Sequence, residues 1–165
     1  MSDKTIETLI PDIQGLFEGH SLSEALGAFT TKLGDTLTSR FEEHLNERTP
    51  TLRMSNIGRP LRQLWYELKG YPKEKLSSET KFKFLYGDLL EALVLFLASR
   101  AGHDVTDLQK KVEINGVTGS IDAIIDGVLV DVKSCSTYSF DKFKPGRLVE
   151  DDPFGYIAQL SGYRT

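Results

Sequence analysis

The chain has 165 residues, of which 39% are hydrophobic and 27% are charged, and its formal net charge is −4 at pH 7. This size and composition indicate one globular domain, or one with a small appendage, and the acidic balance argues against a generic nucleic-acid-binding protein. Its single cysteine, Cys135, excludes an intramolecular disulfide and a cysteine-cluster metal site. His20, His44 and His103 lie far apart without ligand spacing, which argues against a zinc site and a histidine-based nucleophile.

Residues 3–19 and 21–47 are predicted to be helical, because apolar residues recur in them at helical spacing. In the second stretch these residues are Leu22, Leu26, Phe29, Leu33, Leu37 and Phe41. Residues 1–50 contain 9 acidic residues against 4 basic ones, and no motif among them suggests chemistry. We therefore predict an acidic N-terminal helical segment, which serves as an accessory layer or as an arm that contacts a partner.

The next segment is basic and aromatic. Residues 51–83 contain 8 Lys and Arg against 3 Asp and Glu, together with Trp65, Tyr66 and Tyr71. A helix is predicted over residues 59–69. Cations mixed with aromatic rings suit phosphates and nucleobases, whereas the alternative is a solvated basic helix.

A long helix is predicted over residues 78–100, and its second half contains one acidic residue. From residue 89 to residue 98 every residue except Glu91 is apolar. A helix that is apolar on all sides is buried, and a buried carboxylate without a partner is costly. Glu91 therefore needs a cation, a hydrogen-bond donor or a metal ion nearby. The alternative is that it pairs with a lysine at the start of the helix.

Residues 119–134 are predicted to form two strands joined by a type I′ turn at the Asp-Gly dipeptide 126–127, after a strand over residues 110–114. Counting outward from the turn places Asp122 opposite Asp131 on one face of this hairpin. The other face is apolar and is predicted to pack on a core; it contains Ile121, Ala123, Ile125, Val128, Val130 and Val132.

The predicted opposition of two carboxylates is the feature that suggests chemistry. Directly opposed side chains have Cβ atoms about 5 Å apart, and like charges at that spacing destabilise a sheet. A divalent cation with oxygen ligands requires such spacing, so Asp122 and Asp131 are predicted to bind one. Lys133 is then able to reach a substrate phosphate or a water on the metal. The alternative is an exposed sheet face whose polar residues meet solvent.

The C-terminal part of the chain combines a charged loop with a short helix. Residues 142–152 are predicted to form the loop, whose cations are Lys142, Lys144 and Arg147. The final helix is predicted to begin near Pro153. It carries Gln159 and Tyr163 on one face, because these residues are four positions apart.

Taken in order, these motifs resemble a known nuclease superfamily. Asp122 and the later Asp131-Val132-Lys133 resemble the Asp…(Asp/Glu)-x-Lys signature of the PD-(D/E)XK nucleases. Glu91 resembles their acidic first motif. Gln159-Leu-Ser-Gly-Tyr163 resembles the Gln-x-x-x-Tyr motif of the RecB-like branch, which includes phage lambda-type exonucleases.

The resemblance implies an α/β fold of the PD-(D/E)XK, restriction-endonuclease-like type over residues 51–165, with a central mixed β-sheet flanked by helices. Residues 1–50 would be an additional helical segment. Relatives continue beyond the Gln-x-x-x-Tyr helix with a further strand and usually a closing helix, whereas this sequence ends at Thr165. We therefore expect either a core that lacks its C-terminal part or a fold closed in another way, for example through an oligomer.

The function implied by the resemblance is that of a metal-dependent DNA exonuclease of phage type, active in recombination or in DNA end processing and degradation. Asp122, Asp131 and the backbone carbonyl of Val132 would bind Mg²⁺ or Mn²⁺, and Glu91 would complete the ligand set. Some relatives hold an iron–sulfur cluster through a cysteine upstream of these motifs. This sequence has no cysteine there, so we expect no iron–sulfur cluster.

Three further side chains complete the catalytic set implied by the resemblance. Lys133 would act on the attacking water or on the developing charge, and Gln159 and Tyr163 would brace the site or contact the DNA backbone. The residues expected to contact DNA are Arg53, Ser55, Arg59, Arg62, Lys142, Lys144 and Arg147.

The expected substrate is the end of double-stranded DNA. Because many lambda-type exonucleases form rings and work with an annealing protein, the resemblance adds a homo-oligomer and an annealing or recombination protein as candidate partners. The sequence shows no signal peptide, and its longest apolar run, residues 92–98, is too short to span a membrane. We therefore expect a cytoplasmic protein of a bacterial or phage-infected cell, without membrane contact. The alternatives are an endonuclease of the same superfamily, similar to a junction resolvase, a catalytically inactive DNA-binding module, and a purely structural protein.

Overall fold

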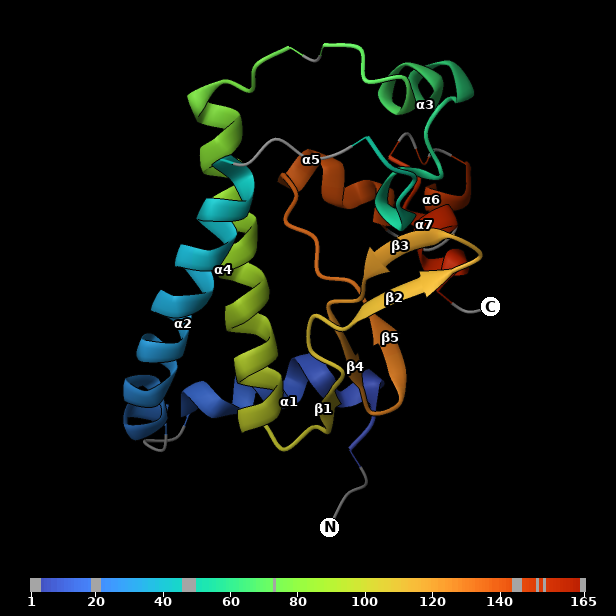
Figure 1. The fold of residues 1–165 in the computed structure, drawn as a ribbon. Helices are drawn as coiled ribbons and strands as arrows, with labels where there is room; N and C mark the ends of the chain where they lie inside the picture. The colour runs from blue at the N-terminus through green and yellow to red at the C-terminus, as the bar shows by residue number, and fades with distance from the viewer. Residues whose placement is uncertain are drawn as a thin grey trace. The chain divides into compact units, whose positions relative to one another are not determined.

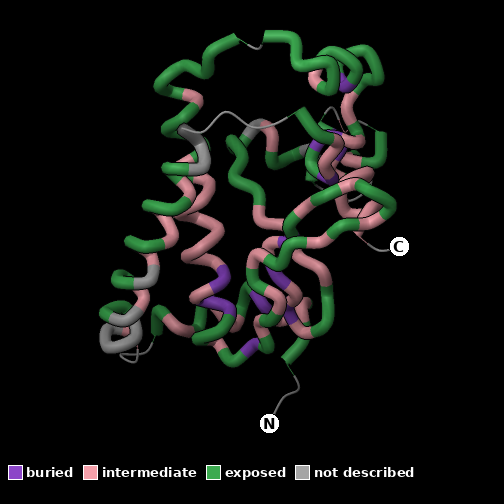
Figure 2. The backbone as a smooth tube through the Cα atoms, viewed as in Figure 1, coloured by how far each residue is buried: buried purple, intermediate pink, exposed green. Residues whose placement is uncertain are grey.

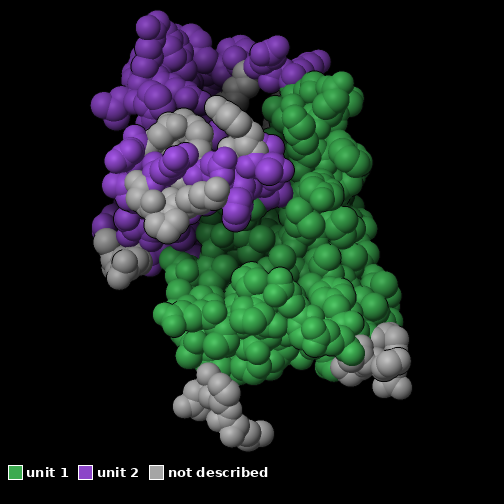
Figure 3. Space-filling view, turned by 180° about the vertical axis from the view of Figure 1, so that it is seen from behind, with its two compact units in different colours: residues 1–47, 76–108, 122–133 green, residues 48–75, 109–121, 134–165 purple. Residues whose placement is uncertain are grey.

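The computed structural model describes residues 4–18, 22–45, 50–72, 74–143, 147–150, 152 and 154–163. The chain forms two compact units, which Figure 3 shows in different colours. Unit 1 consists of residues 1–47, 76–108 and 122–133, and unit 2 consists of residues 48–75, 109–121 and 134–165. Both units contain helices and a small antiparallel sheet, so the α/β class expected from the sequence is confirmed (Figure 1).

Unit 1 is built around a long helix, α4, which spans Ser78–Arg100 as predicted. The Ser77 hydroxyl caps this helix by accepting a hydrogen bond from the backbone N–H of Thr80 at 3.2 Å. A second long helix packs along α4, and the rings of Phe29 and Phe96 stack across this interface with centroids 4.3 Å apart. The other helices of unit 1 are η1 (Ile6–Thr8), α1 (Leu9–Gly15), η2 (Leu16–Glu18) and the partner of α4, α2 (Leu22–Leu45).

The sheet of unit 1 has the order β1-β4-β5 and is antiparallel. Its strands are β1 (Val105–Thr106), β4 (Ala123–Ile125) and β5 (Val128–Val130). The predicted register of the β4–β5 hairpin is confirmed over the three pairs that the ladder contains, from Ile125–Val128 at the turn to Ala123–Val130. The ladder ends there, so Asp122 and Asp131 do not form the pair within the sheet that the sequence predicted.

The early end of the ladder has a local cause. The backbone N–H of Ile121 donates to the carbonyl of Lys110 at 3.1 Å, which aligns the chain before Asp122 with a different hairpin. The N–H of Val132 donates instead to Oδ2 of Asp122 at 2.8 Å. A side chain therefore replaces the backbone acceptor that a longer strand would have supplied.

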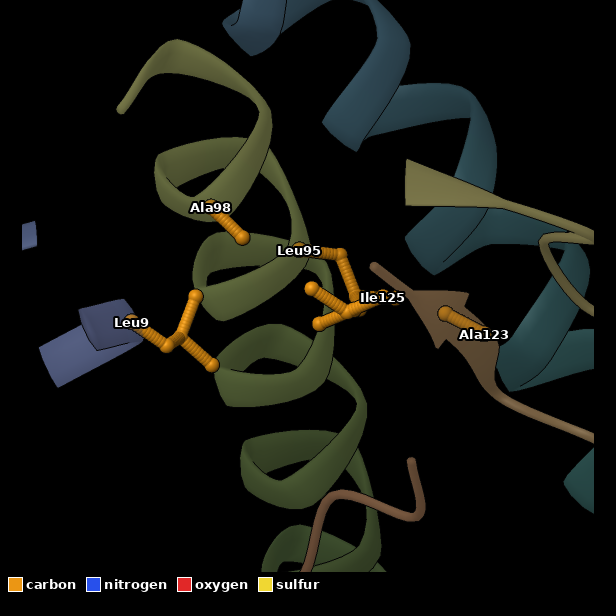
Figure 4. Packing of buried hydrophobic residues seen from close by; sticks show 5 residues of the cluster. All are labelled: Leu9, Leu95, Ala98, Ala123 and Ile125. Carbon is orange, nitrogen blue, oxygen red and sulfur yellow. The ribbon is translucent and has the colours of Figure 1, made fainter. Parts of the chain in front are cut away.

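The core of unit 1 lies between α1, α4 and β4. Leu9 approaches α4 from one side and Ile125 from the other, next to Leu95 (Figure 4). Ala98, Ala123 and Ile125 are fully enclosed, and the buried residues of this unit concentrate in the second half of α4 and in β4 (Figure 2). The predicted apolar face of the hairpin is confirmed for Ala123 and Ile125, whereas Val128, at the turn, remains exposed.

Unit 2 contains a two-stranded antiparallel sheet, in which β2 (Lys111–Ile114) pairs with β3 (Val117–Ser120). Asn115 and Gly116 form the connecting turn and both have positive φ, which this kind of turn requires. The helices of unit 2 are η3 (Met54–Asn56), α3 (Leu61–Leu68), α5 (Thr137–Phe140), η4 (Asp141–Phe143), α6 (Arg147–Glu150) and α7 (Tyr156–Gly162).

The final helix begins at Tyr156, slightly later than expected. Its start is determined by Asp152, whose two carboxylate oxygens accept hydrogen bonds from the N–H groups of Tyr156 and Ile157 at 3.0 and 2.8 Å. The expected loop over residues 142–152 is wrong in part, because η4 and α6 each place a short helical turn in it.

Two larger expectations also differ from the structure. The described strands form two separate antiparallel sheets instead of one central mixed sheet, and the one parallel pairing among them and their neighbours is an isolated bridge between Arg53 and Thr118. Residues 1–47 do not form a unit of their own, since α1 and α2 pack with α4 in unit 1. None of the helices within the described ranges is long and apolar enough to cross a membrane.

Candidate acidic site

The structure gathers five of the predicted site residues in unit 1. Glu91 lies on α4, Asp122 immediately precedes β4, and residues 131–133 immediately follow β5. Because β4 and β5 are antiparallel and joined by a two-residue turn, the start of β4 and the end of β5 lie at the same end of the hairpin. We call Glu91, Asp122, Asp131 and Lys133 the acidic site.

Asp122 is partly buried and is oriented by the backbone. Its Oδ2 atom accepts the hydrogen bond from the Val132 N–H at 2.8 Å. Burial raises the pKa of the Asp122 carboxyl above its ordinary value, and the negative charge of Asp131 raises it further. The Val132 hydrogen bond and the positive charge of Lys133 act in the opposite direction. The ionised form of Asp122 is therefore costly in the folded protein.

Glu91 is the most perturbed carboxyl of the site. Burial and repulsion from Asp122 raise its pKa to about 7, and Asp88 adds to this repulsion. Only 16% of the Glu91 side chain is exposed, and its Oε1 atom lies 3.6 Å from Nη2 of Arg40. Arg40 is thus a cation, one of the three kinds of partner that the buried position of Glu91 was predicted to need. It lowers the pKa of Glu91 but does not cancel the effects of burial and repulsion.

Asp131 forms the closest ion pair of the site. Its Oδ1 atom lies 2.6 Å from Nζ of Lys133, and the side chains of Asp131 and Lys133 are 10% and 32% exposed. The positive charge of Lys133 also lowers the pKa values of Asp122 and Glu91. One lysine therefore acts on all three carboxylates, which places it at the centre of the charge distribution.

Arg40 is the member of this environment that the sequence analysis missed. No chemistry was expected in helix α2, yet the guanidinium of Arg40 acts on Glu91 and on Asp122. A signal was present in the sequence: Arg40 follows Leu33 and Leu37 at the spacing of the apolar stripe, where the pattern predicts another buried position. A cation on such a stripe indicates a buried acidic partner.

The donor set fits a divalent metal ion in kind. Carboxylate oxygens are the ligands that Mg²⁺ and Mn²⁺ prefer, and the repulsion of Asp122 on Glu91 and of Asp131 on Asp122 would be reduced by a cation between them. The arrangement is a different matter: within the described ranges, no three Asp, Glu, His or Cys side chains are placed as the ligands of one metal ion. The carboxylates of the acidic site contact groups of the chain instead, namely Arg40, Lys133 and the N–H of Val132.

Gln159 and Tyr163 belong to unit 2 and are not part of the acidic site as the structure defines it. Tyr163 follows the last residue of α7, and its hydroxyl donates to the carbonyl of Ser120 at 2.8 Å. The same hydroxyl would lie 2.8 Å from a Cβ atom placed on Gly119, so the glycine permits this close approach. Tyr163 therefore braces strand β3, and its expected roles at the catalytic site and on the DNA backbone stay predictions.

The residues expected to contact DNA also lie in unit 2. Ser55 is exposed in η3, and Arg53, the residue immediately before this helix, is half-buried. Arg59 pairs with Glu67 at 2.7 Å, which neutralises its charge, whereas the guanidinium of Arg62 lies over the ring of Tyr66 at 5.8 Å from its centroid. Arg147 is exposed at the start of α6. Lys144 and the side chain of Lys142 lie outside the described residues.

Comparisons of the chain with protein-family models, with curated proteins and with solved structures find no match. The nuclease family inferred from the sequence motifs therefore stays a prediction. The argument for a function depends on the residues themselves.

Proposed function

We propose that this protein is a metal-dependent deoxyribonuclease with a PD-(D/E)XK core, and that it acts as an exonuclease on DNA ends. The observation that supports this proposal is the acidic site. Glu91, Asp122 and Asp131 come from separate parts of the chain, yet Asp122 raises the pKa of Glu91 and Asp131 raises the pKa of Asp122, with Lys133 beside Asp131.

Partly buried carboxylates that repel one another destabilise the folded state unless a ligand compensates for the repulsion. Partly buried carboxylates with raised pKa values cluster at functional sites, because the ligand or the reaction compensates for the repulsion between them. In the proposed reaction Asp122, Asp131 and the Val132 carbonyl hold Mg²⁺ or Mn²⁺, with Glu91 as a direct or water-mediated ligand. Such an ion supplies a more acidic water and stabilises the charge that develops on the phosphate.

The contact between Lys133 and Asp131 would keep the ammonium group of Lys133 beside the proposed metal site. Nζ of Lys133 lies 2.6 Å from Asp131 and would remain beside any group held by that carboxylate. From this position the ammonium group would orient the attacking water and stabilise negative charge on the phosphate oxygens. The cations Arg53, Arg62 and Arg147, together with Ser55, would contact the phosphates of the DNA backbone.

One observation favours a second candidate, a catalytically inactive DNA-binding module. The carboxylates of the acidic site already contact Arg40, Lys133 and a backbone N–H, and within the described part of the chain they do not converge on one point. If these contacts persist in the presence of metal, the site neutralises itself and binds nothing. The two candidates differ in whether the protein responds to Mg²⁺.

The test is digestion of linear double-stranded DNA with and without Mg²⁺ or Mn²⁺, beside a covalently closed circle of the same sequence. We expect metal-dependent loss of the linear DNA only, and a decrease of roughly a thousandfold or more in Asp131→Ala. Asp35→Ala is the matched control, because Asp35 is an exposed aspartate of helix α2. It should digest DNA as the wild type does.

Three results would lead elsewhere. Cleavage of the closed circle would identify an endonuclease. Cleavage that survives Asp131→Ala would remove the acidic site from the mechanism. A folded protein that neither cleaves DNA nor gains thermal stability from Mg²⁺ would support the inactive module, because an ion bound only by the folded state raises its stability.

A further inference from the structure

Helix α3 and the turn after it expose three aromatic side chains. Trp65 is 49% exposed, Tyr66 39% and Tyr71 52%. All three belong to unit 2, and their rings contact one another. Large aromatic side chains that remain in water on a helix surface indicate a binding surface when they occur together.

The three rings form one cluster with open faces. The centroids of Tyr66 and Tyr71 are 5.0 Å apart with the rings nearly perpendicular, and Trp65 meets Tyr66 in the same edge-to-face manner at 5.1 Å. Trp65 and Tyr71 are tilted at 35° with centroids 5.8 Å apart. Each edge-to-face contact covers one face of one of its two rings, and the exposed fractions of the three side chains show that part of their surface remains in solvent, where a further planar group could stack.

A cavity of about 720 Å³ opens beside this cluster. Tyr66 and Tyr71 line it, together with Arg62, Gln63, Pro60 and Pro72 among others. Its volume lies within the range of roughly 300–1,000 Å³ that is usual for small-molecule sites, which is ample for a nucleobase and its sugar. The leucines exposed on the same helix, Leu61 and Leu68, do not line it. The lining therefore combines two tyrosine rings and two prolines with polar side chains, among them Glu67 and Glu74.

The charge of this segment is the opposite of that of the whole chain. Residues 51–72 contain four Arg and Lys and one acidic residue, Glu67, whereas the net charge of the chain is −4. Glu67 is held by Arg59 at 2.7 Å and by Nδ2 of Asn56 at 3.4 Å. Arg62 lines the cavity and lies over the face of Tyr66, so a positive charge accompanies the rings. Glu74 is the second acidic residue at the cavity.

We propose that this aromatic cavity binds single-stranded DNA, with unpaired bases stacked on Tyr66 and Tyr71 and a backbone phosphate held by Arg62. Stacking on aromatic rings is tolerant of sequence, because every base has a π-face, and adjacent cations follow the backbone. The inference rests on the proposed function in one respect, since it names the unpaired strand of a DNA end as the substrate class. Its physical basis lies entirely in unit 2.

Trp65 is a built-in reporter for this site, because it is the single tryptophan of the chain and contacts both tyrosines. The experiment titrates the full chain with a thymidine oligonucleotide in EDTA and follows tryptophan fluorescence. We expect saturable quenching by the single strand and a much weaker response to a blunt duplex of the same length. Affinity is measured separately by the anisotropy of a labelled oligonucleotide.

Variants locate the site. Tyr66→Leu and Tyr71→Leu should each weaken binding by about tenfold, since the loss of one stacked base typically changes affinity by that order. Tyr71→Phe keeps the ring face and should bind as the wild type does, which separates stacking from hydrogen bonding. Tyr86→Leu is the matched control, because Tyr86 is equally exposed, at 51%, on helix α4 of unit 1. Circular dichroism melts confirm that each variant is folded.

The proposal is overturned if the oligonucleotide leaves Trp65 fluorescence unchanged, or if the two tyrosine variants bind it as tightly as Tyr86→Leu does. Failure to bind single strands by a folded protein would instead assign the exposed aromatic surface to a protein partner. These outcomes are independent of catalysis, because EDTA removes the metal. Asp131→Ala, which tests the nuclease, should bind the oligonucleotide as the wild type does.

Discussion

Unit 1 contains two groups of acidic side chains in opposite electrostatic situations. In the acidic site, burial and repulsion from a neighbouring aspartate raise the pKa values of Glu91 and Asp122. In the second group, around His103, the pKa values of Asp12 and Asp126 are lowered. Both groups join helices to the β4–β5 hairpin, so the difference does not arise from position in the fold. It arises from what each carboxylate contacts.

The carboxylates of the second group interact with groups of the chain itself, and His103 contacts both of them. Its side chain is completely enclosed, with Nδ1 2.6 Å from Oδ2 of Asp126 and Nε2 3.3 Å from Oδ2 of Asp12. The first contact is a hydrogen bond, whereas the second lacks hydrogen-bond geometry and is electrostatic. Asp126 also accepts from the N–H of Asp104 at 3.1 Å, and Asp12 pairs with Lys4 at 2.9 Å. The hydrogen bonds of Lys4 and Thr8 are the main cause of the lowered pKa of Asp12.

Structural and functional carboxylates of this molecule can be distinguished by whether contacts within the chain lower their pKa values or burial and repulsion raise them. The His103 group is neutralised by its own chain and fastens α1, the end of α4 and the hairpin turn to one another. The acidic site keeps a repulsion that Arg40 and Lys133 reduce without removing. Stability therefore depends on the first group, and a cationic ligand would stabilise the second. Substitutions in either group test this difference.

The largest effect on stability is expected from His103→Ala. The substitution removes an enclosed side chain and its hydrogen bond to Asp126, so it should lower the free energy of unfolding by about 2–4 kcal/mol. Thermal and urea denaturation at neutral pH measure the loss. A melting temperature equal to that of the wild type would show that the His103 group contributes no stability. The two acidic groups would then not differ in the way proposed.

Glu91→Gln should have the opposite sign. The pKa of Glu91 is about 7 in the folded protein and ordinarily 4.5, so the folded state binds more protons than the unfolded state between these values. The stability of the wild type should therefore fall as pH rises from 4.5 to 7. Glu91→Gln should lack the part of this fall that Glu91 causes and should be more stable by about 2 kcal/mol at pH 8, part of the repulsion being screened by solvent.

The pH range separates this effect from that of the other group. Asp12 and Asp126 have lowered pKa values, so their contribution is present above pH 3.8 and is lost as pH falls below it. Denaturation measured from pH 3 to pH 8 should show both limbs in the wild type and a smaller upper limb in Glu91→Gln, where Asp122 is a remaining carboxyl with a raised pKa. A decline between pH 4.5 and 7 that is as large in Glu91→Gln as in the wild type would contradict the raised pKa of Glu91.

Local patterns predicted much of the frame in which these groups lie. The long helix α4 was predicted with its bounds at about residues 78 and 100, because its apolar run and the glycine after it agree. The turn of the β4–β5 hairpin was predicted because an Asp-Gly dipeptide favours positive φ at both residues. Asp126 and Gly127 both have positive φ in the structure. Periodicity and turn chemistry act over a few residues, so they are readable from one sequence.

The contacts between distant segments were not predicted. Asp122 was expected to oppose Asp131 within the sheet, but the ladder ends before it, because Ile121 bonds to Lys110 instead. His103 was considered only as a metal ligand, and its two aspartates come from a helix far earlier and a turn later in the chain. Such partners are chosen by packing, which a local pattern does not encode. For the same reason the need of Glu91 for a partner was predicted, whereas the identity of that partner, Arg40, was not.

Arg40→Gln should produce the smallest of the three effects and completes the comparison. The guanidinium lowers the pKa values of Glu91 and Asp122, so its removal should raise both and move the fall in stability to higher pH. The 3.6 Å separation from Glu91 and the 24% exposure of the Arg40 side chain indicate a loose pair, worth about 0.5–1 kcal/mol. Lys81→Gln, at an exposed position of α4, is the control. If Arg40→Gln left the pH profile unchanged while Glu91→Gln reduced its upper limb, the cation acting on Glu91 would be Lys133 alone. The charge balance of the acidic site would then need no residue beyond those of the sequence motifs.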